Sequence, residues 1–454
     1  MSQHRRGVGD HALGAAGDDE AAFGLPAGGG GAVIAQGVTG PPLWESIRVT
    51  TLRHDDVDAA QLRDDLVNTL LAKGMITSPE VERAFRAVPR EQFVADGTPL
   101  EVTYSLDASV PIRRDANGVV ISSTSAAYIQ ARMIEQAGLG PGMSVLEIGS
   151  GGYNAALLAE VVGRQGRVVS VDIDPLVTDR AGELLDAAGY GDRVTVVQAD
   201  AEKPIPGLDE PVDAVLVTAG AWDIEPSWLD HLSDTGTLVV PLRMNGVTRV
   251  VAFRREDAHL VGTSAEIAGF VPMQGEGAGA HAERIFHLPD PGGHLVKLRF
   301  EDDVPADMGA LDGVLAAGRS ELWSGVTTPH GVSFAGLHLW LAAFLPGFCK
   351  VAADPGTEMA AEKGWFPFAA VQGDSFAYLT LRPDGSGAEF GARAYGTQGR
   401  DAAAAMVEQI QAWDRSGRDH EPTIAYWPTG SHPPASGDHT AVLVKEHGVA
   451  TVSW

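Results

Sequence analysis

The sequence contains a single cysteine, no long hydrophobic run and few basic residues. One thiol, Cys349, excludes an internal disulfide and a zinc cluster built on cysteines, and it fits a reducing cytosol. No stretch approaches the roughly 18 consecutive apolar residues of a membrane-spanning helix. Lys and Arg number 33 against 60 Asp and Glu, a formal net charge of −27. Such a surface repels phosphate backbones and anionic lipid, so we expect no nucleic-acid or membrane partner; a small cation or a basic or neutral peptide fits better.

The beginning of the chain is poor in bulky apolar side chains. Residues 1–43 are rich in glycine and alanine and include the run Gly28–Gly31. They offer too little apolar surface to offset the entropy of ordering them, which predicts a disordered segment, with a binding arm as the alternative. Arg5 and Arg6 are followed by GVGDHALGAAGDDE, where an export signal would need an apolar core. We therefore predict no signal peptide and a cytoplasmic location.

The middle of the chain alternates between short apolar runs and helical patterns. The 454 residues are 44% apolar, enough for two or three domains. Apolar spacing predicts helices over residues 59–74 and 79–87. Strands are then expected at SVLEIG, RVVSVDID, RVTVVQAD, VDAVLVTAG and TLVVPL, with helices at AALLAEVVG, TDRAGELLDAAG and PSWLDHLSD. This alternation predicts an α/β domain over residues 44–288 with a mostly parallel sheet between helices.

A different pattern follows PDPGG at residues 289–293, which we interpret as a linker. Amphipathic strands are expected at HLVKLRFE, SFAYLTLRP and AEFGARAYG, with helices over residues 336–345 and 401–416. The chain closes with TAVLVKEHGVATVSW. Residues 289–454 are therefore predicted to form an α+β domain.

The most informative segment is VLEIGSGGYN, in which a strand runs through closely spaced glycines into a helix. Such a turn directs backbone amides at a ligand. The dinucleotide fingerprint needs a third glycine at the position of Asn154. An adenosine ligand without that phosphate contact fits better, which suggests S-adenosylmethionine. An ordinary strand–helix turn is the alternative.

Two carboxylates follow later strands of the same pattern. Asp172 ends its strand 23 residues after Gly149, about where an acid meets ribose hydroxyls in nucleoside-binding α/β folds. Asp200 ends the next strand, at the same edge of a parallel sheet. The alternatives are a strand-end cap for Asp172 and a helix-start residue for Asp200.

Several segments together resemble the protein-L-isoaspartate O-methyltransferase family. They are AVPREQFV, GVVISS, VLEIGSGGYNAALLAE, PVDAVLVTAGA, GTLVVPL and FVPM, in the family's order over roughly residues 60 to 275. The resemblance implies a Rossmann-like S-adenosylmethionine-dependent methyltransferase. It implies Ser122 as the catalytic serine, with Ser123 and Thr124 near the substrate. It implies cofactor contacts from Glu147, Gly149, Ser150, Gly151, Gly152, Asn154, Asp172, Ile173, Asp200 and Ala201, and no metal.

The role implied for Ser122 suits the chemistry, because an acceptor carboxylate with an ordinary pKa of about 4 needs no general base near neutrality. A hydroxyl that orients the carboxylate is enough. The alternative is a structural one: a residue among Ser122, Ser123, Thr124 and Ser125 is expected to cap the helix AAYIQARMIEQAG.

The chain also departs from the family. The usual Gly-x-Gly-x-Gly-Tyr is one residue shorter, Ser123 and Thr124 replace Gln-Pro or Ala-Pro, and a whole domain follows FVPM. These features resemble a branch that methylates an aspartate of ribosomally made modified peptides (lanthipeptides, lasso peptides and graspetides), whose ester collapses to succinimide (aspartimide) and isoaspartate. The added domain is then expected to recognise that precursor peptide. Repair of isoaspartate in damaged proteins and a non-catalytic scaffold are the alternatives, and the oligomeric state stays open.

Overall fold

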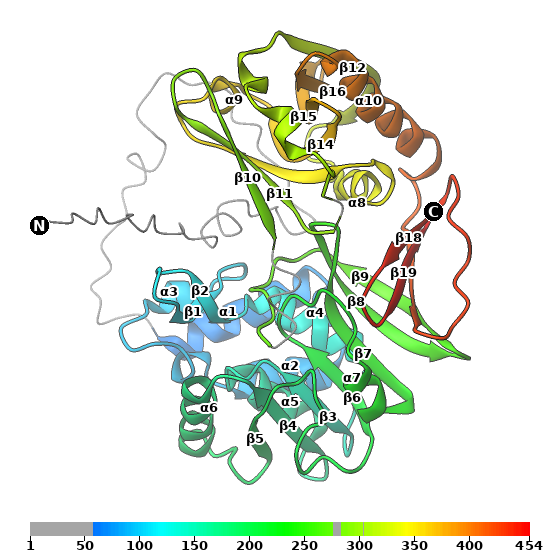
Figure 1. Ribbon diagram of the computed structural model, residues 1–454. Coiled ribbons are helices and arrows are strands. Elements are labelled where there is room, and N and C mark those ends of the chain that lie inside the picture. The colour runs from blue at the N-terminus through cyan, green and yellow to red at the C-terminus, as the bar shows by residue number, and fades with distance from the viewer. Residues whose placement is uncertain (1–57, 276–282, 303) are drawn as a thin grey trace, which may run out of the picture.

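The computed structural model describes residues 58–275, 283–302 and 304–454 (Figure 1). The predicted disordered segment, residues 1–43, lies outside the described residues. Helices α1 (Ala59–Ala72) and α2 (Pro79–Ala87) begin the described chain and confirm the two helices expected there. Asp58 and Ser78 cap them, each accepting a backbone N–H of the first turn. No described helix is long and apolar enough to cross a membrane.

A small hairpin and two helices lead into the main sheet. The hairpin pairs β1 (Val110–Arg114) with β2 (Val120–Thr124), antiparallel. Around it lie α3 (Leu100–Thr103) and α4 (Ala127–Ala137). The hairpin is the part of this segment that reaches the pocket described below.

Five parallel strands form one half of a ten-stranded sheet, which confirms the predicted α/β fold. In spatial order they are β7 (Leu232–Met244), β6 (Val212–Val217), β3 (Ser144–Ile148), β4 (Arg167–Asp172) and β5 (Val194–Gln198). The connecting helices are α5 (Tyr153–Val162), α6 (Pro175–Ala187) and α7 (Pro226–His231). Chain order runs outward from β3 through β4 to β5 and then returns to β6 on the other side of β3. That reversal creates the crevice in which such sheets bind ligands.

The same sheet continues as antiparallel strands, three of which come from the end of the chain. Next to β7 lie β8 (Val247–Glu256), β9 (His259–Glu266), β17 (Thr423–Pro428), β19 (Gly448–Ser453) and β18 (Thr440–Val444). The β9–β17 contact pairs Ala425 with Val261 and Tyr426 with Leu260. The expected boundary near residue 289 therefore does not divide the chain into two consecutive domains, because the last 30 or so residues complete the first sheet (Figure 1).

The segment between β9 and β17 forms a separate, antiparallel seven-stranded sheet. Its spatial order is β10 (Arg284–Pro289), β11 (Leu295–Phe300), β13 (Phe348–Ala353), β14 (Trp365–Gln372), β15 (Ser375–Asp384), β16 (Gly387–Tyr395) and β12 (Arg319–Pro329). Helices α8 (Ala335–Phe344), α9 (Glu358–Ala361) and α10 (Gly399–Ser416) accompany it. The interpretation of PDPGG as a linker is wrong: residues 290–294 are the tight turn of the β10–β11 hairpin, closed by the Asp290 N–H to His294 carbonyl bond of 2.8 Å.

A continuous hydrophobic core joins the two sheets. Buried side chains of β7 and β8 such as Leu242 and Phe253 share one cluster with Leu341 and Trp340 of α8. The β7–β8 turn adds polar contacts, since Asn245 Nδ2 donates to the Ala342 carbonyl at 3.0 Å. The opposite face of the main sheet packs against α1, α2, α4 and α5. The added part of the chain is thus built onto the methyltransferase-like sheet.

This arrangement predicts that the first 289 residues do not fold by themselves. A chain ending at Pro289 would leave the β9 edge unpaired and expose the apolar surface that β7 and β8 bury against α8. We expect this truncation to aggregate or to lose the cooperative unfolding transition of the full chain in circular dichroism. A monomeric truncation that melts cooperatively and binds S-adenosylhomocysteine would contradict the shared core.

Candidate active site

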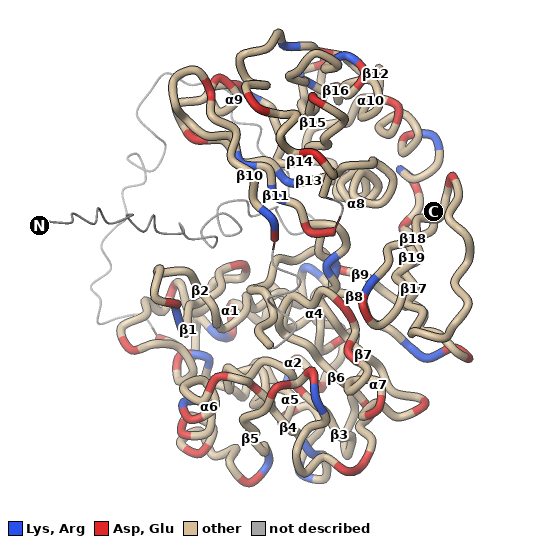
Figure 2. The backbone as a smooth tube through the Cα atoms, in the orientation of Figure 1, with Lys and Arg blue, Asp and Glu red and all other residues tan. Residues whose placement is uncertain are grey.

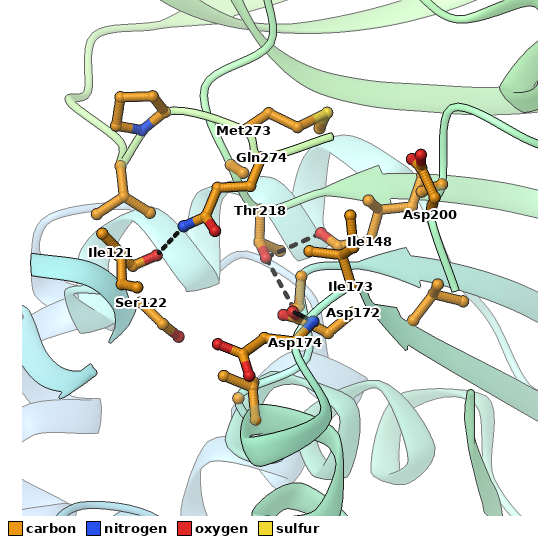
Figure 3. A pocket seen from close by; sticks show the side chains of 18 of the residues that line it. Ile121, Ser122, Ile148, Asp172, Ile173, Asp174, Asp200, Thr218, Met273 and Gln274 are labelled. Atoms are coloured by element: carbon orange, nitrogen blue, oxygen red, sulfur yellow. Dashed lines mark hydrogen bonds between the residues drawn. The ribbon is translucent and has the colours of Figure 1, made fainter. Parts of the chain in front are cut away.

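A pocket opens at the carboxyl ends of β3, β4, β5 and β6 (Figure 3). Its wall contains the following residues: Ile121, Ser122, Ser123, Ile148, Gly149, Gly151, Val171, Asp172, Ile173, Asp174, Val177, Ala199, Asp200, Ala201, Glu202, Thr218, Ala219 and Val271–Gln274. Ser122 lies on one side of this pocket and Asp200 on the other, with Asp172 between them (Figure 3). The fold therefore brings the predicted catalytic serine and the two predicted cofactor carboxylates into one pocket.

The glycine turn after β3 has no room for a side chain at its first position. Gly149 has a φ of 98°, and a Cβ atom there would overlap the Thr218 hydroxyl. That hydroxyl donates toward the carbonyls of Ile148 and Gly149, each at 3.0 Å, and so fixes the turn (Figure 3). A Cβ at Gly151 would lie 3.2 Å from Ile112 Cδ1 of the β1–β2 hairpin. The two glycines keep the floor of the pocket open.

Asp172, at the end of β4, holds the turn through its carboxylate. Its Oδ2 accepts the Ser150 N–H at 3.0 Å and its Oδ1 accepts the Asp174 N–H at 2.9 Å. Burial raises the pKa of Asp172 to about 6, although backbone N–H groups of Ser150 and Ile173 and the charge of Arg113 act in the opposite direction. The alternative interpretation of Asp172 as a strand-end cap is therefore correct in part: the same carboxylate orders the loop and also lines the pocket.

Four of the expected cofactor contacts lie behind the pocket wall. Asn154 Nδ2 donates to Glu147 Oε1 at 2.8 Å, and the Ser170 hydroxyl contacts both Glu147 and Ser150. Burial raises the pKa of Glu147 to about 7. Gly152, with a φ of 85°, caps α5 against Phe93. The side chains of these residues support the turn from within, and they do not line the pocket.

Ser122 and Ser123 belong to strand β2, and both line the pocket. The prediction that a residue from Ser122 to Ser125 caps the next helix is wrong, because α4 begins after Ala126 and has no side-chain cap. Thr124 is buried, and its hydroxyl lies away from the pocket wall with no hydrogen-bond partner. Strand pairing with β1, rather than capping, decides where the two serines point.

Asp200 lies opposite Ser122 in the pocket, and Ala201 also lines it. Asp200 Oδ1 accepts the Glu202 N–H at 3.1 Å, and its Oδ2 lies 3.7 Å from Lys203 Nζ. The carboxylate therefore orders the turn after β5 and also faces the pocket. Its helix-start reading is wrong, since the structure has a turn at this point.

Some pocket residues were not expected from the sequence. Thr218 follows β6. Gln274 follows the FVPM segment, and its Nε2 donates to the Ile121 carbonyl at 3.3 Å (Figure 3). Asp174 is the N-cap of α6, where its Oδ1 accepts the Leu176 N–H at 3.0 Å. It also lines the pocket and pairs with Arg113. The sequence signal that could have indicated Thr218 and Asp174 is the polar residue that follows the end of a parallel strand.

A second cavity adjoins the first and shares Glu202 and Met273 with it. Its other lining residues are Lys203, Pro204, Ala221, Trp222, Asp223, Glu225, Pro226, Ser227, Asp230, Glu446 and His447. Glu446 and His447 belong to the β18–β19 turn, so the returning end of the chain reaches the neighbourhood of the pocket. Buried Asp223 anchors that turn by accepting the His447 N–H and the Tyr426 hydroxyl, both at 2.6 Å.

The charges around the second cavity are mainly acidic. His447 Nε2 lies 3.2 Å from Glu225 Oε2. Burial raises the pKa of Glu225 above its ordinary range, while the His447 charge opposes this. Acidic side chains are also spread over the rest of the molecule (Figure 2). The cavity therefore continues the acidic character of the chain next to the pocket.

Comparisons with known proteins agree with this geometry. Residues 61–278 match the family described as Protein-L-isoaspartate(D-aspartate) O-methyltransferase (PCMT). The Protein-L-isoaspartate O-methyltransferase of Hyperthermus butylicus is 36% identical over 225 residues, 48% of this chain and 90% of that protein. The one of Korarchaeum cryptofilum is 35% identical over 220 residues, 46% of this chain and 96% of that protein. The chain belongs to the protein-L-isoaspartate O-methyltransferase family.

Solved structures of similar proteins carry the same description. A protein-L-isoaspartate O-methyltransferase covers 80% of this chain and 96% of its own length, at 20% identity and a TM-score of 0.45. One from Plasmodium falciparum, solved with S-adenosyl-L-homocysteine, covers 47% of this chain and 98% of its own, at 16% identity and a TM-score of 0.41.

As a member of this family, the chain is a methyltransferase. Its pocket fits the expected S-adenosylmethionine: side chains are absent where Gly149 and Gly151 form the floor, and carboxylates stand at the ends of β4 and β5. In the described part of the chain, no three His, Cys, Asp or Glu side chains are grouped to hold a metal ion. The pocket wall thus combines carboxylates, hydroxyl groups and apolar side chains.

The raised pKa of Asp172 predicts a pH-dependent affinity for the cofactor. We expect Asp172 to accept from the ribose hydroxyls, and an ionised carboxylate accepts more strongly than a protonated one. Affinity should therefore fall as the pH drops below about 6 and Asp172 binds a proton, whereas an ordinary aspartate would stay ionised to about pH 4. Calorimetry with S-adenosylhomocysteine measures this. Asp172→Asn should weaken binding by roughly ten-fold or more near pH 7.5, because each charge-assisted hydrogen bond contributes about 1.5–3 kcal/mol.

The asparagine variant is also the control for the pH effect. Its affinity should vary little between about pH 5 and 7.5, since the titrating group is gone. If the variant keeps the wild-type pH profile, a different group, such as Glu147, is responsible.

Proposed function

We propose that this chain methylates an aspartate side chain of a ribosomally made, modified peptide, using S-adenosylmethionine. The ester then forms a succinimide, which opens to aspartate or isoaspartate. The observation that carries the proposal is the second cavity: the β18–β19 turn, outside the 61–278 segment that matches the family, lines a cavity that adjoins the cofactor pocket. Repair of arbitrary damaged proteins does not need such an added wall.

The proposed reaction asks little of the protein's side chains. When bound, S-adenosylmethionine supplies an electrophilic methyl group, which an acceptor carboxylate oxygen takes as the carbon–sulfur bond breaks and its electrons stay on sulfur. The acceptor is already ionised near neutrality, so the chain has to orient it and exclude water. In the proposal Ser122 donates a hydrogen bond to the acceptor, with Ser123 beside it. Asp172 accepts from the ribose, and Asp200 and Ala201 line the opposite wall.

The product ester explains why an aspartate is a useful acceptor. The backbone nitrogen of the following residue attacks the ester carbonyl. Methoxide leaves and takes up the proton of that nitrogen to give methanol. A carboxylate does not react in this way, because oxide is a much poorer leaving group than methoxide. A five-membered succinimide results. This step needs no group from the enzyme, so a site without a catalytic acid or base is sufficient.

Selectivity then has to come from contacts remote from the reacting oxygen, since one peptide carboxylate resembles another. The second cavity offers such contacts. Its wall combines apolar surface from Trp222, Pro226 and Met273 with carboxylates such as Glu225 and Glu446. We infer that residues flanking the methylated aspartate bind there, and that neutral or basic flanking residues are favoured.

Acceptor preference distinguishes this proposal from repair and from a scaffold. Methyl transfer from labelled cofactor should be measured on a short isoaspartyl peptide, on aged protein and on a cyclised, ribosomally made precursor peptide. We expect efficient transfer to the precursor, seen by mass spectrometry as a methyl gain followed by loss of methanol. Equal rates on all acceptors would favour repair, and no transfer to any carboxylate would favour a scaffold.

Ser122→Ala should slow methyl transfer while leaving cofactor affinity unchanged. The acceptor loses one hydrogen bond that orients it, which we expect to lower kcat by roughly 10- to 100-fold. Ser125→Ala, outside the pocket wall, is the matched control. The measurement is the transfer rate together with calorimetry for S-adenosylhomocysteine. If Ser122→Ala behaves like its control, the serine does not contact the acceptor.

Glu446→Lys should change acceptor use without changing the cofactor. Glu446 is exposed at the rim of the second cavity, so reversing its charge should raise KM for the precursor peptide by about three- to ten-fold, in line with exposed charge pairs worth up to 1 kcal/mol or slightly more. Glu408→Lys, an exposed charge reversal on α10, is the control. Identical KM values for both variants would remove the cavity from peptide recognition.

A further inference from the structure

The β1–β2 hairpin carries Ser122 on one strand and an arginine directly across from it. In the antiparallel register, Arg113 pairs with Ser122 and Pro111 with Ser123. The connecting turn is well fixed, since Asp115 Oδ1 accepts the N–H groups of Asn117 at 2.8 Å and Val119 at 2.9 Å. Any contact that holds Arg113 in place therefore also sets the position of Ser122.

Arg113 reaches across the rim of the pocket to the loop that follows β4. Its guanidinium forms an ion pair with Asp174 Oδ2, and the two side chains are 35% and 15% exposed. The other oxygen of Asp174 caps α6, while the Asp174 N–H donates to Asp172. A chain of direct contacts thus runs from the strand of Ser122, through Arg113 and Asp174, to the carboxylate of Asp172.

The hairpin has two further contacts with the pocket, and both are uncharged. Ile112 packs next to Gly151, and Gln274 donates to the Ile121 carbonyl at 3.3 Å. Removal of the ion pair should therefore leave the hairpin folded and near the pocket, while its distance from the Asp172 loop becomes less well defined. The ion pair adds a charged contact between the hairpin and the Asp172 loop.

We propose that Arg113 is a positioning residue for methyl transfer: through its ion pair with Asp174 it holds the Ser122 strand at a fixed distance from the Asp172 loop. The proposal rests on the methyltransferase activity of the family and is independent of which peptide is the acceptor. In-line transfer is sensitive to such spacing, because a displacement of about 1 Å can cost about 100-fold in rate.

Arg113 has a second effect on the same loop, which is electrostatic. Its positive charge favours the ionised form of Asp172 against burial. Carboxylates also surround this loop: Glu147 lies behind the turn, and Asp174 and Asp200 line the pocket, with Lys203 beside Asp200. Loss of Arg113 removes the positive charge that favours the ionised form of Asp172, so its pKa should rise and cofactor binding should weaken further near neutrality.

The test compares Arg113→Ala with Arg114→Ala, its neighbour on the same strand. Arg114 Nη1 donates to the Gly118 carbonyl within the turn at 2.7 Å, so its loss affects the hairpin without crossing the pocket. We expect Arg113→Ala to lower kcat about ten-fold, by loss of positioning, and Arg114→Ala to change it less than about two-fold. Arg113→Lys should recover part of the rate. Melting temperatures of the two alanine variants should be similar.

Cofactor binding provides a measurement that does not depend on the acceptor. In Arg113→Ala, the pH midpoint for S-adenosylhomocysteine affinity should move upward, so that the variant approaches wild type in alkaline buffer. Asp174→Asn keeps a capping oxygen for α6 but removes the ion pair, so it should reproduce the loss of kcat without adding to it in the double variant. The pH midpoint should not move upward in Asp174→Asn, because this variant loses a carboxylate near Asp172 and keeps Arg113.

Specific outcomes would overturn the proposal. It is wrong if Arg113→Ala matches Arg114→Ala in kcat and in the pH profile, or if the effects of Arg113→Ala and Asp174→Asn add independently. A protein that methylates only generic isoaspartyl peptides, yet shows the kcat loss and the pH shift, would refute the peptide-tailoring function and leave the role of Arg113 intact.

Discussion

The pairing of β17 with β9 is the constraint on which the rest of the structure depends. Through it the last strands of the chain extend the methyltransferase sheet, and the β18–β19 turn is anchored on Asp223 beside the second cavity. The seven-stranded sheet in between is held by the core that α8 shares with β7 and β8. An extension of the family fold therefore shapes the surroundings of the pocket, while the residues that line the pocket belong to the segment that matches the family.

The pocket combines an open floor with buried acids. Gly149 and Gly151 provide space, whereas Asp172 and Glu147 keep the turn in place. Burial raises the pKa values of both carboxyl groups. Buried carboxylates of this kind are held by backbone N–H groups and by Asn154, as expected for polar groups away from water. Methyl transfer between opposite charges suits such a site, because excluding water strengthens the attraction between them.

Much of this could be predicted from the sequence, and the exceptions have physical causes. The strands around Asp172 and Asp200 were recognisable because parallel strands are apolar throughout and end in polar residues. Not every polar residue of the VLEIGSGGYN motif lines the pocket. The side chains of Glu147, Ser150 and Asn154 point behind the pocket wall, because successive residues of the strand and turn face opposite sides. Ser122 was placed near a helix start, whereas pairing with β1 put it in a strand. The sequence PDPGG indicates a turn, which occurs both in linkers and in hairpins. The place of β17 in the first sheet could not be predicted, because pairing between distant segments produces no pattern in the local sequence.

The central claim is that the returning end of the chain forms part of the acceptor site of this methyltransferase. Hydrogen–deuterium exchange tests it most directly, with the intact protein held in saturating S-adenosylhomocysteine and compared with and without the acceptor peptide. The account predicts that backbone amides of the β18–β19 turn, around Glu446 and His447, become protected on addition of the peptide, together with those of β2. Protection confined to β2 and the glycine turn, with the β18–β19 turn unchanged, would contradict it.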